Sequence, residues 1–128
     1  MKKCNQEQQR PKILVIDDNY LFLETLLELL DTKGFNGIGT QQGFLGIQLA
    51  QTQMPHVIIC DINLPDFNGY EVLRQLRQNP AIAKIPLIFI TANPMNNAQD
   101  LIQKTGANGY LSKPFSIDQL IEIIQAQL

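Results

Sequence analysis

The chain reads ILVIDD over residues 13–18, a run of four apolar residues that ends in two carboxylates, Asp17 and Asp18. Three later apolar runs also end in a polar side chain that can bind or react: VIICD over 57–61, LIFIT over 87–91 and YLSK over 110–113. Such runs are typical of parallel strands buried on both faces. The carboxyl ends of parallel strands share one edge of the sheet, where these sheets bind ligands. The sequence therefore predicts one shared site, with side chains from Asp17, Asp18, Asp61, Thr91 and Lys113.

Between these runs, apolar residues recur with helical spacing, which predicts five βα units on a doubly wound parallel sheet. The expected strands cover about 12–17, 35–40, 56–61, 86–92 and a short segment ending at 113. The expected helices cover about 20–33, 42–53, 70–78, 95–105 and 116–128, the last with Ile117, Leu120, Ile121, Ile124 and Leu128 on one face. Asn19 and the pair Ser116 and Gln119 are predicted to cap helices. Glycines at 37 and 39 interrupt the second strand, which is also poor in β-branched residues and therefore suits a sheet edge.

The composition is that of a single globular domain. The 128 residues are 45% hydrophobic and 17% charged, with a net charge of -2. This balance provides no broad attraction to nucleic acid or anionic lipid, so we expect no direct nucleic-acid binding. Residues 1–10 form a polar leader without an apolar stretch, and residues 11–128 form the domain. We therefore expect neither a signal peptide nor membrane insertion, and a cytoplasmic location.

The carboxylates indicate a metal site. Asp17, Asp18 and Asp61 would repel one another and raise each other's pKa unless a cation lay among them. Oxygen ligands without His or Cys favour Mg²⁺, with Mn²⁺ as an alternative. Because Mg²⁺ often binds phosphate oxygens as well, Lys113 and the hydroxyl of Thr91 are candidates to contact a phosphoryl group. Asp61 is the best-placed nucleophile.

With these residues in place, the sequence resembles the receiver domains of two-component response regulators. The resemblance covers residues 11–128 and rests on Asp-Asp after the first strand, Asp after the third, Thr-Ala after the fourth and Lys-Pro-Phe after the fifth. It implies the flavodoxin-like (βα)5 fold with strand order 2-1-3-4-5. It also implies a phosphoacceptor switch in a phosphorelay, which catalyses only its own phosphotransfer and autodephosphorylation.

The resemblance also implies a role for each site residue. Asp61 would be the phosphoacceptor, taking a phosphoryl group from the phosphohistidine of a sensor histidine kinase or a histidine phosphotransfer protein. Asp18, Asp61 and the backbone carbonyl of Asn63 would bind the metal directly, and Asp17 would act through water or by orienting its neighbours. The expected phosphoryl ligands are Lys113, the hydroxyl of Thr91 and the backbone N–H groups of Asn63 and Ala92.

By the same resemblance, the molecule would switch its partner surface. Thr91 would move toward the phosphoryl group, and Tyr110 would turn inward into the space left behind. The surface of the fourth helix, fifth strand and fifth helix would then change and bind an output partner. A homodimer is also compatible with the resemblance. The bond between Lys113 and Pro114 is expected to be cis.

Three other functions fit the sequence less well. A phosphohydrolase with an aspartyl nucleophile needs an acid two residues later, where this chain has Asn63. A receiver that serves only as a scaffold would be expected to have lost Asp61 or Lys113. A nucleoside-triphosphate enzyme is disfavoured because no glycine-rich loop follows the first strand.

The loop after Asp61 is interpreted as a turn rather than as a set of ligands. Asp66 and Asn68 are expected to form the turn, and Gly69 to provide conformational freedom. Cys60 is expected to be a small core residue that points away from the site.

Overall fold

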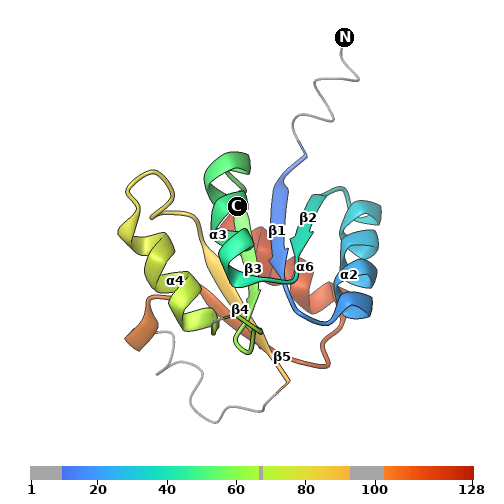
Figure 1. Cartoon of the computed structure of the whole chain (residues 1–128). Helices are drawn as coiled ribbons and strands as arrows, with labels where there is room; N and C mark the ends of the chain where they lie inside the picture. Colours follow the sequence, from blue (N-terminus) through green and yellow to red (C-terminus); the bar gives the residue numbers. More distant parts are fainter. Residues whose placement is uncertain (1–9, 67, 93–102) are drawn as a thin grey trace.

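The computed structural model describes residues 10–66, 68–92 and 103–128. Its centre is a five-stranded parallel sheet in the order β2-β1-β3-β4-β5 (Figure 1). The strands are β1 (Lys12–Ile16), β2 (Asn36–Thr40), β3 (Val57–Asp61), β4 (Leu87–Thr91) and β5 (Gly109–Ser112). The predicted doubly wound sheet and its strand order are confirmed.

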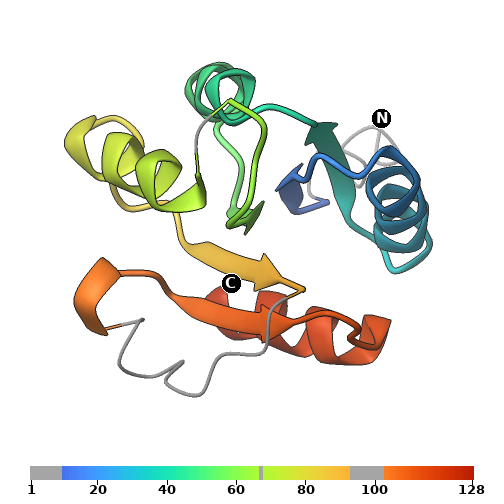
Figure 2. The ribbon, with the colours of Figure 1, turned by 60° about the horizontal axis from the view of Figure 1, so that its bottom comes forward.

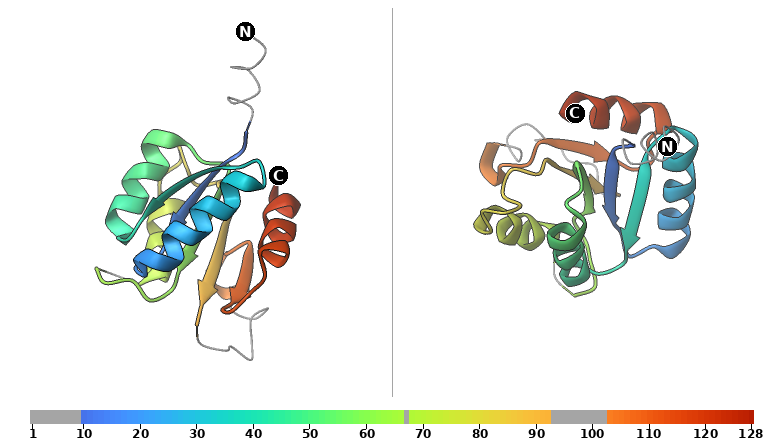
Figure 3. Two further views of the ribbon diagram at one scale, coloured as in Figure 1. Left: turned by 90° about the vertical axis from the view of Figure 1, so that its right-hand side faces the viewer. Right: turned by 90° about the horizontal axis from the view of Figure 1, so that it is seen from above.

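Helices cover both faces of the sheet. They are α2 (Tyr20–Thr32), α3 (Gly43–Gln53), α4 (Gly69–Gln78) and α6 (Ile117–Gln127). Helices α2 and α6 pack on one face, and α3 and α4 on the other (Figures 2 and 3). The helix predicted over 95–105 lies outside the described residues except for 103–105, which are helical.

The alternation of side chains along each central strand divides the core into two layers. In β1, Ile13 and Val15 contribute to the cluster with α2 and α6, whereas Leu14 and Ile16 contribute to the cluster with α3 and α4. All four side chains are almost completely buried. Burial on both faces explains why the central strands are continuous apolar runs in the sequence.

Strand β2 lies at the edge of the sheet, as its glycines predict. A Cβ atom at Gly39 would lie 2.8 Å from Leu23 Cδ1, and one at Gly37 would lie 2.9 Å from Leu27 Cδ2. Glycine at these positions therefore allows α2 to pack closely against β2. The two glycines that make the strand hard to recognise in the sequence thus make room for the leucine side chains of α2.

The predicted caps are present at two helices. The side chain of Asn19 accepts a hydrogen bond from the backbone N–H of Phe22, and Ser116 and Gln119 form a reciprocal capping box. One expectation for the last helix is wrong: Leu128 follows α6 and has 57% of its surface exposed, whereas Leu120 and Ile124 of α6 are buried. Among the helices that the structure describes, none is long and apolar enough to cross a membrane.

Candidate functional site

The strand register brings the predicted site residues to one edge of the sheet. Ile16 pairs with Cys60, so the residues that follow them, Asp17 and Asp61, are neighbours at the ends of β1 and β3. At the other side of β3, Thr91 at the end of β4 pairs with Ser112 of β5, and Lys113 follows directly. Residues far apart in the sequence therefore meet because their strands are parallel and end together.

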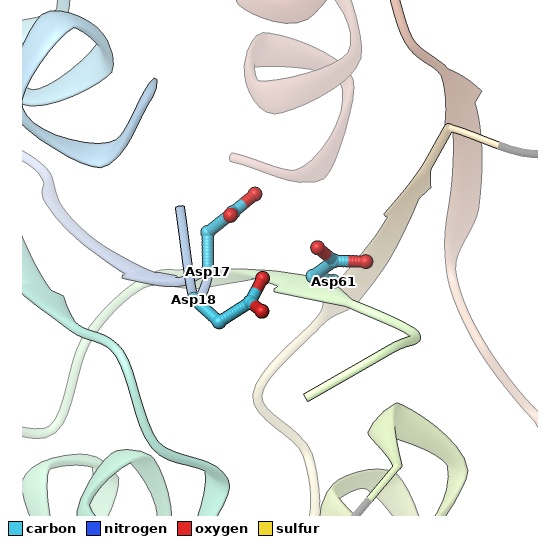
Figure 4. Close-up of side chains that lie close together, drawn as sticks. All are labelled: Asp17, Asp18 and Asp61. Atoms are coloured by element: carbon cyan, nitrogen blue, oxygen red, sulfur yellow. The ribbon is translucent and has the colours of Figure 1, made fainter. Parts of the chain in front are cut away.

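Three carboxylates form a compact cluster there. Asp17, Asp18 and Asp61 each offer an oxygen atom within 4.8 Å of the others (Figure 4). Asp17 is fully buried and Asp61 has 6% of its surface exposed, whereas Asp18 is exposed. The cluster thus extends from the interior to the surface, so that an ion or a phosphoryl group could reach it from solvent.

Lys113 lies against the buried side of this cluster. Its Nζ is 2.7 Å from Oδ2 of Asp17 and 3.5 Å from Oδ2 of Asp61. Its backbone N–H donates to the carbonyl of Thr91 at 2.7 Å, and this bond holds the Lys113 backbone against the end of β4. The peptide bond between Lys113 and Pro114 is cis. Within the part of the chain that the structure describes, the Lys113 ammonium is the one cation paired with the three-carboxylate cluster, so two negative charges remain in excess.

The pKa of Asp61 reflects this environment. Burial raises it above the ordinary value, and the charge of Asp17 acts in the same direction. The backbone N–H of Asn63, which donates to Asp61 Oδ1 at 3.1 Å, and the ammonium of Lys113 lower it in part. The balance is still a raised pKa, because the effect of burial is the largest of these contributions. A further cation in the cluster would favour the ionised form of Asp61.

The donor set suits a hard divalent ion. All three side chains offer carboxylate oxygen, and neither His nor Cys joins the cluster within residues 10–66, 68–92 and 103–128. The two excess negative charges match the charge of Mg²⁺, which takes one or two carboxylates and keeps other positions for water or phosphate. The residues present therefore fit Mg²⁺ better than a softer metal.

The two predicted switch residues are linked to one another. Thr91 has only 1% of its surface exposed, and Tyr110 is half-buried against the core with α3 and α4. Burial raises the pKa of Tyr110, and hydrogen bonds with the side chains of Ser112 and Thr91 oppose this rise. A movement of Thr91 would therefore disturb Tyr110 directly. Ala92, exposed at the end of β4, completes the predicted set.

Two neighbours of the site were missed in the sequence. Lys113 Nζ lies 4.2 Å from the centroid of the Phe22 ring, which packs edge-to-face against Phe115. The side chain of Gln41 donates to the backbone carbonyl of Asp18 at 3.0 Å. In the sequence, Phe22 is one of several apolar residues of the first helix. Helical spacing identifies the apolar face of a helix, but it does not show that an aromatic ring on this helix contacts a charged group.

The loop after Asp61 also differs from its interpretation as a simple turn. Asp66 accepts hydrogen bonds from the backbone of Gly43 and Phe44, in the first turn of α3, and Asn68 caps α4. At Gly69 the requirement is space rather than turn freedom, because a Cβ atom would lie 2.6 Å from the Asp61 carbonyl oxygen. The expectation that Cys60 is a small core residue is confirmed, since it is fully buried in the core with α3 and α4.

Comparison with known proteins gives a consistent result. Residues 13–125 match the family described as the response regulator receiver domain. The polar-differentiation response regulator DivK of Brucella anthropi is 32% identical over 116 residues, which are 91% of this chain and 94% of DivK.

Solved structures agree with this. The chemotaxis response regulator CheY4 of Vibrio cholerae has a TM-score of 0.85 and 25% identity, covering 94% of this chain and all of its own. The receiver domain of the sensor histidine kinase PA1611 from Pseudomonas aeruginosa has a TM-score of 0.83 and 27% identity, covering 92% of this chain and 97% of its own. That structure holds a magnesium ion coordinated in its active-site cleft.

The match extends over nearly the whole domain, and the sheet order, the acidic cluster and its lysine are all present in one chain. Such domains act in two-component signalling as phosphoacceptor switches rather than as enzymes with a free substrate. This chain belongs to the response regulator receiver domain family.

Proposed function

We propose that the protein accepts a phosphoryl group on Asp61 in the presence of Mg²⁺ and transmits this change to a partner protein. The observation that carries the proposal is the charge of the site: three carboxylates lie together, and among the described residues Lys113 alone forms an ion pair with them. The excess of negative charge favours the binding of a cation, and the buried Asp61 has a carboxylate oxygen 3.5 Å from the Lys113 ammonium.

The metal would be held by Asp18, Asp61 and the backbone carbonyl of Asn63, with Asp17 orienting its neighbours. Bound there, Mg²⁺ supplies charge neutralisation for the phosphoryl oxygens. Mn²⁺ is the alternative ion for the same oxygen ligands. Two observations support this metal site: the three carboxylates offer oxygen ligands, and the exposure of Asp18 leaves one side of the cluster open to solvent.

In the transfer itself, a carboxylate oxygen of Asp61 attacks the phosphorus of a phosphohistidine. The new O–P bond forms as the N–P bond breaks, and the imidazole leaves and takes a proton from solvent. Lys113 can then turn from the Asp61 carboxylate to the phosphoryl oxygens, which are stronger acceptors. The hydroxyl of Thr91 and the backbone N–H groups of Asn63 and Ala92 provide the remaining hydrogen bonds.

The output follows from the contact between Thr91 and Tyr110. When Thr91 bonds to the phosphoryl group, its hydrogen bond with Tyr110 is lost and the ring moves inward. We propose that the partner surface comprises the helix predicted over 95–105, β5 and α6, because Tyr110 belongs to β5. The donor would be a histidine kinase or a phosphotransfer protein in the cytoplasm, and dimerisation of the phosphorylated form is a second output to measure.

The test uses a small-molecule phosphodonor with and without Mg²⁺, with intact mass as the readout. We expect a gain of one phosphoryl group that requires the metal, disappears after hydroxylamine treatment and is absent in Asp61→Asn. Continuous release of phosphate from added phosphoesters would favour a hydrolase instead. If neither signal appeared with any competent donor, the domain would be a scaffold and the proposal would be wrong.

A further inference from the structure

Helix α3 receives its N-terminal cap from a distant loop. Its own N-cap residue, Gln42, makes no side-chain hydrogen bond to the helix. Asp66 takes this place: Oδ1 accepts from the backbone N–H of Gly43 at 2.9 Å, and Oδ2 accepts from that of Phe44 at 2.9 Å. The first turn of α3, which the structure describes in full, has no acidic side chain of its own. Asp66 is thus the carboxylate at the positive end of this helix.

The loop that carries Asp66 is the loop that carries Asn63. At its start, the backbone N–H of Asn63 donates to Asp61 Oδ1 at 3.1 Å, and at its end the N–H of Gly69 donates to the carbonyl of Ile62 at 2.7 Å. Pro65, between Asn63 and Asp66, has a restricted φ angle. The segment from Asn63 to Asp66 is therefore short and stiff, and its far end is fastened to α3.

We propose that Asp66 is a positioning residue: by fastening this loop to α3, it holds the backbone of Asn63 in place for Mg²⁺ and for the phosphoryl group. The inference rests on the proposed function, because it assigns Asn63 the role given there. By thermodynamic reciprocity, an ion that fixes Asn63 also strengthens the bonds from Asp66 to α3. The site and the start of α3 are then coupled through one carboxylate.

A purely structural role would have a different signature. If Asp66 only stabilised α3, any other cap on that helix would replace it. Gln42 already has the extended backbone of an N-cap residue, with φ -123 and ψ 139. Gln42→Ser can therefore cap α3 locally without restoring the bridge to the loop. This second substitution separates helix stability from loop position.

The experiment compares Asp66→Ala, Asp66→Asn and Asp66→Ala with Gln42→Ser. Alanine and asparagine remove the same charge, but asparagine keeps one oxygen that can accept a hydrogen bond from α3. Arg10→Ala is the control, since Arg10 bonds to Asp31 and Phe35 at the opposite end of β1. For each variant we would measure Mg²⁺ affinity by calorimetry, unfolding by urea, and amide exchange at Asn63, Gly43 and Phe44 by NMR.

For Asp66→Ala we expect Mg²⁺ affinity to fall about tenfold, the range seen when residues behind a metal ligand are removed. Asp66→Asn should lose less. Adding Gln42→Ser to Asp66→Ala should restore the free energy of unfolding but not the Mg²⁺ affinity. Arg10→Ala should lower the free energy of unfolding and leave the Mg²⁺ affinity unchanged. In the wild type, Mg²⁺ should slow exchange at Gly43 and Phe44.

Equal Mg²⁺ affinity in Asp66→Ala and the wild type, or full recovery of affinity by Gln42→Ser, would overturn the inference. A wild type that binds no Mg²⁺ would overturn the proposed function instead. In that case amide exchange of Asn63 in the metal-free protein decides the inference. If the hydrogen bonds from α3 to Asp66 hold Asn63 in place, exchange at Asn63 must be faster in Asp66→Ala. Unchanged exchange would show that Asp66 does not position Asn63.

Discussion

Lys113 lies closer to Asp17 than to the proposed phosphoacceptor: its Nζ is 2.7 Å from Asp17 Oδ2 and 3.5 Å from Asp61 Oδ2. Asp17 is fully buried and has no other cation beside it among the residues that the structure describes. The lysine therefore compensates the most deeply buried charge of the site. Its contact with Asp61 is longer, and the other carboxylate oxygen of Asp61 accepts a hydrogen bond from the backbone N–H of Asn63.

Lys113→Met should destabilise the metal-free protein by about 3 kcal/mol, because it leaves the buried Asp17 carboxylate without its partner. Urea unfolding in the presence of a chelator measures this. Part of the loss should return in Mg²⁺, which would replace one cation by another. The control is Lys12→Met, whose Nζ bonds to the carbonyl of Gln53 at the other end of β1. Equal stability of Lys113→Met and the wild type would contradict the compensation of Asp17.

Mg²⁺ should stabilise the folded protein, and a chelator should remove the effect. At a concentration of 100 times the dissociation constant, an ion that binds only the folded state adds about 2.7 kcal/mol. Thermal unfolding at several Mg²⁺ concentrations measures this shift. In Asp61→Asn the shift should be much smaller, because one of the three carboxylates is gone. A shift of the same size in both proteins would place the ion elsewhere.

Phe22→Leu should weaken the site through Lys113. The ring stands 4.2 Å from Nζ, and a partly desolvated contact of this kind contributes about 1 kcal/mol. Leucine keeps an apolar side chain at this position but lacks an aromatic ring face, whereas Phe22→Tyr keeps one. We expect slower phosphorylation of Phe22→Leu by a small-molecule donor and a near-normal rate for Phe22→Tyr. Identical rates for both variants would show that the ring serves packing only.

Gly69→Ala should be more harmful than its size suggests. The added Cβ atom would lie 2.6 Å from the carbonyl oxygen of Asp61 and 3.0 Å from Cα of Ile62, and both neighbours are backbone. Relief requires a shift of the loop or of α4, with an expected cost of about 2 kcal/mol. The free energy of unfolding, measured in urea, and the phosphorylation rate should both fall. A variant with wild-type values in both would show that the loop has room to move.

Glu71 offers a pH test away from the site. The hydrogen bond from Arg74, with a second one from Gln75, lowers the pKa of the Glu71 carboxyl to about 2. Because the folded-state pKa lies below the usual value of 4.5, the stabilisation by the ion pair is fully present above pH 4.5 and is lost as pH falls from 4.5 toward 2. NMR titration of the carboxyl should show the low midpoint, and Arg74→Met should raise it. A midpoint near 4.5 in the wild type would exclude the ion pair in solution.

Most of the fold could be predicted because its signals are local. Continuous apolar runs identify strands buried on both faces, helical spacing identifies the covering helices, and Asn19 and Ser116 fall at true helix starts. The polar residues at the strand ends also predicted the site, since parallel strands must bring those ends to one edge. The register then brought the carboxyl groups of Asp17 and Asp61 and the ammonium of Lys113 together.

By itself, the sequence determined the order and type of the described elements and the residue types at the ends of the strands. Only the tertiary structure decided that Lys113 leans toward Asp17, that the Phe22 ring meets its ammonium, and that Asp66 caps α3. The reason is physical: these contacts join segments of the chain whose separation is set by packing distances of a few ångströms. Residue spacing records periodicity along the chain, but it contains no measure of the distance between two loops that meet in space.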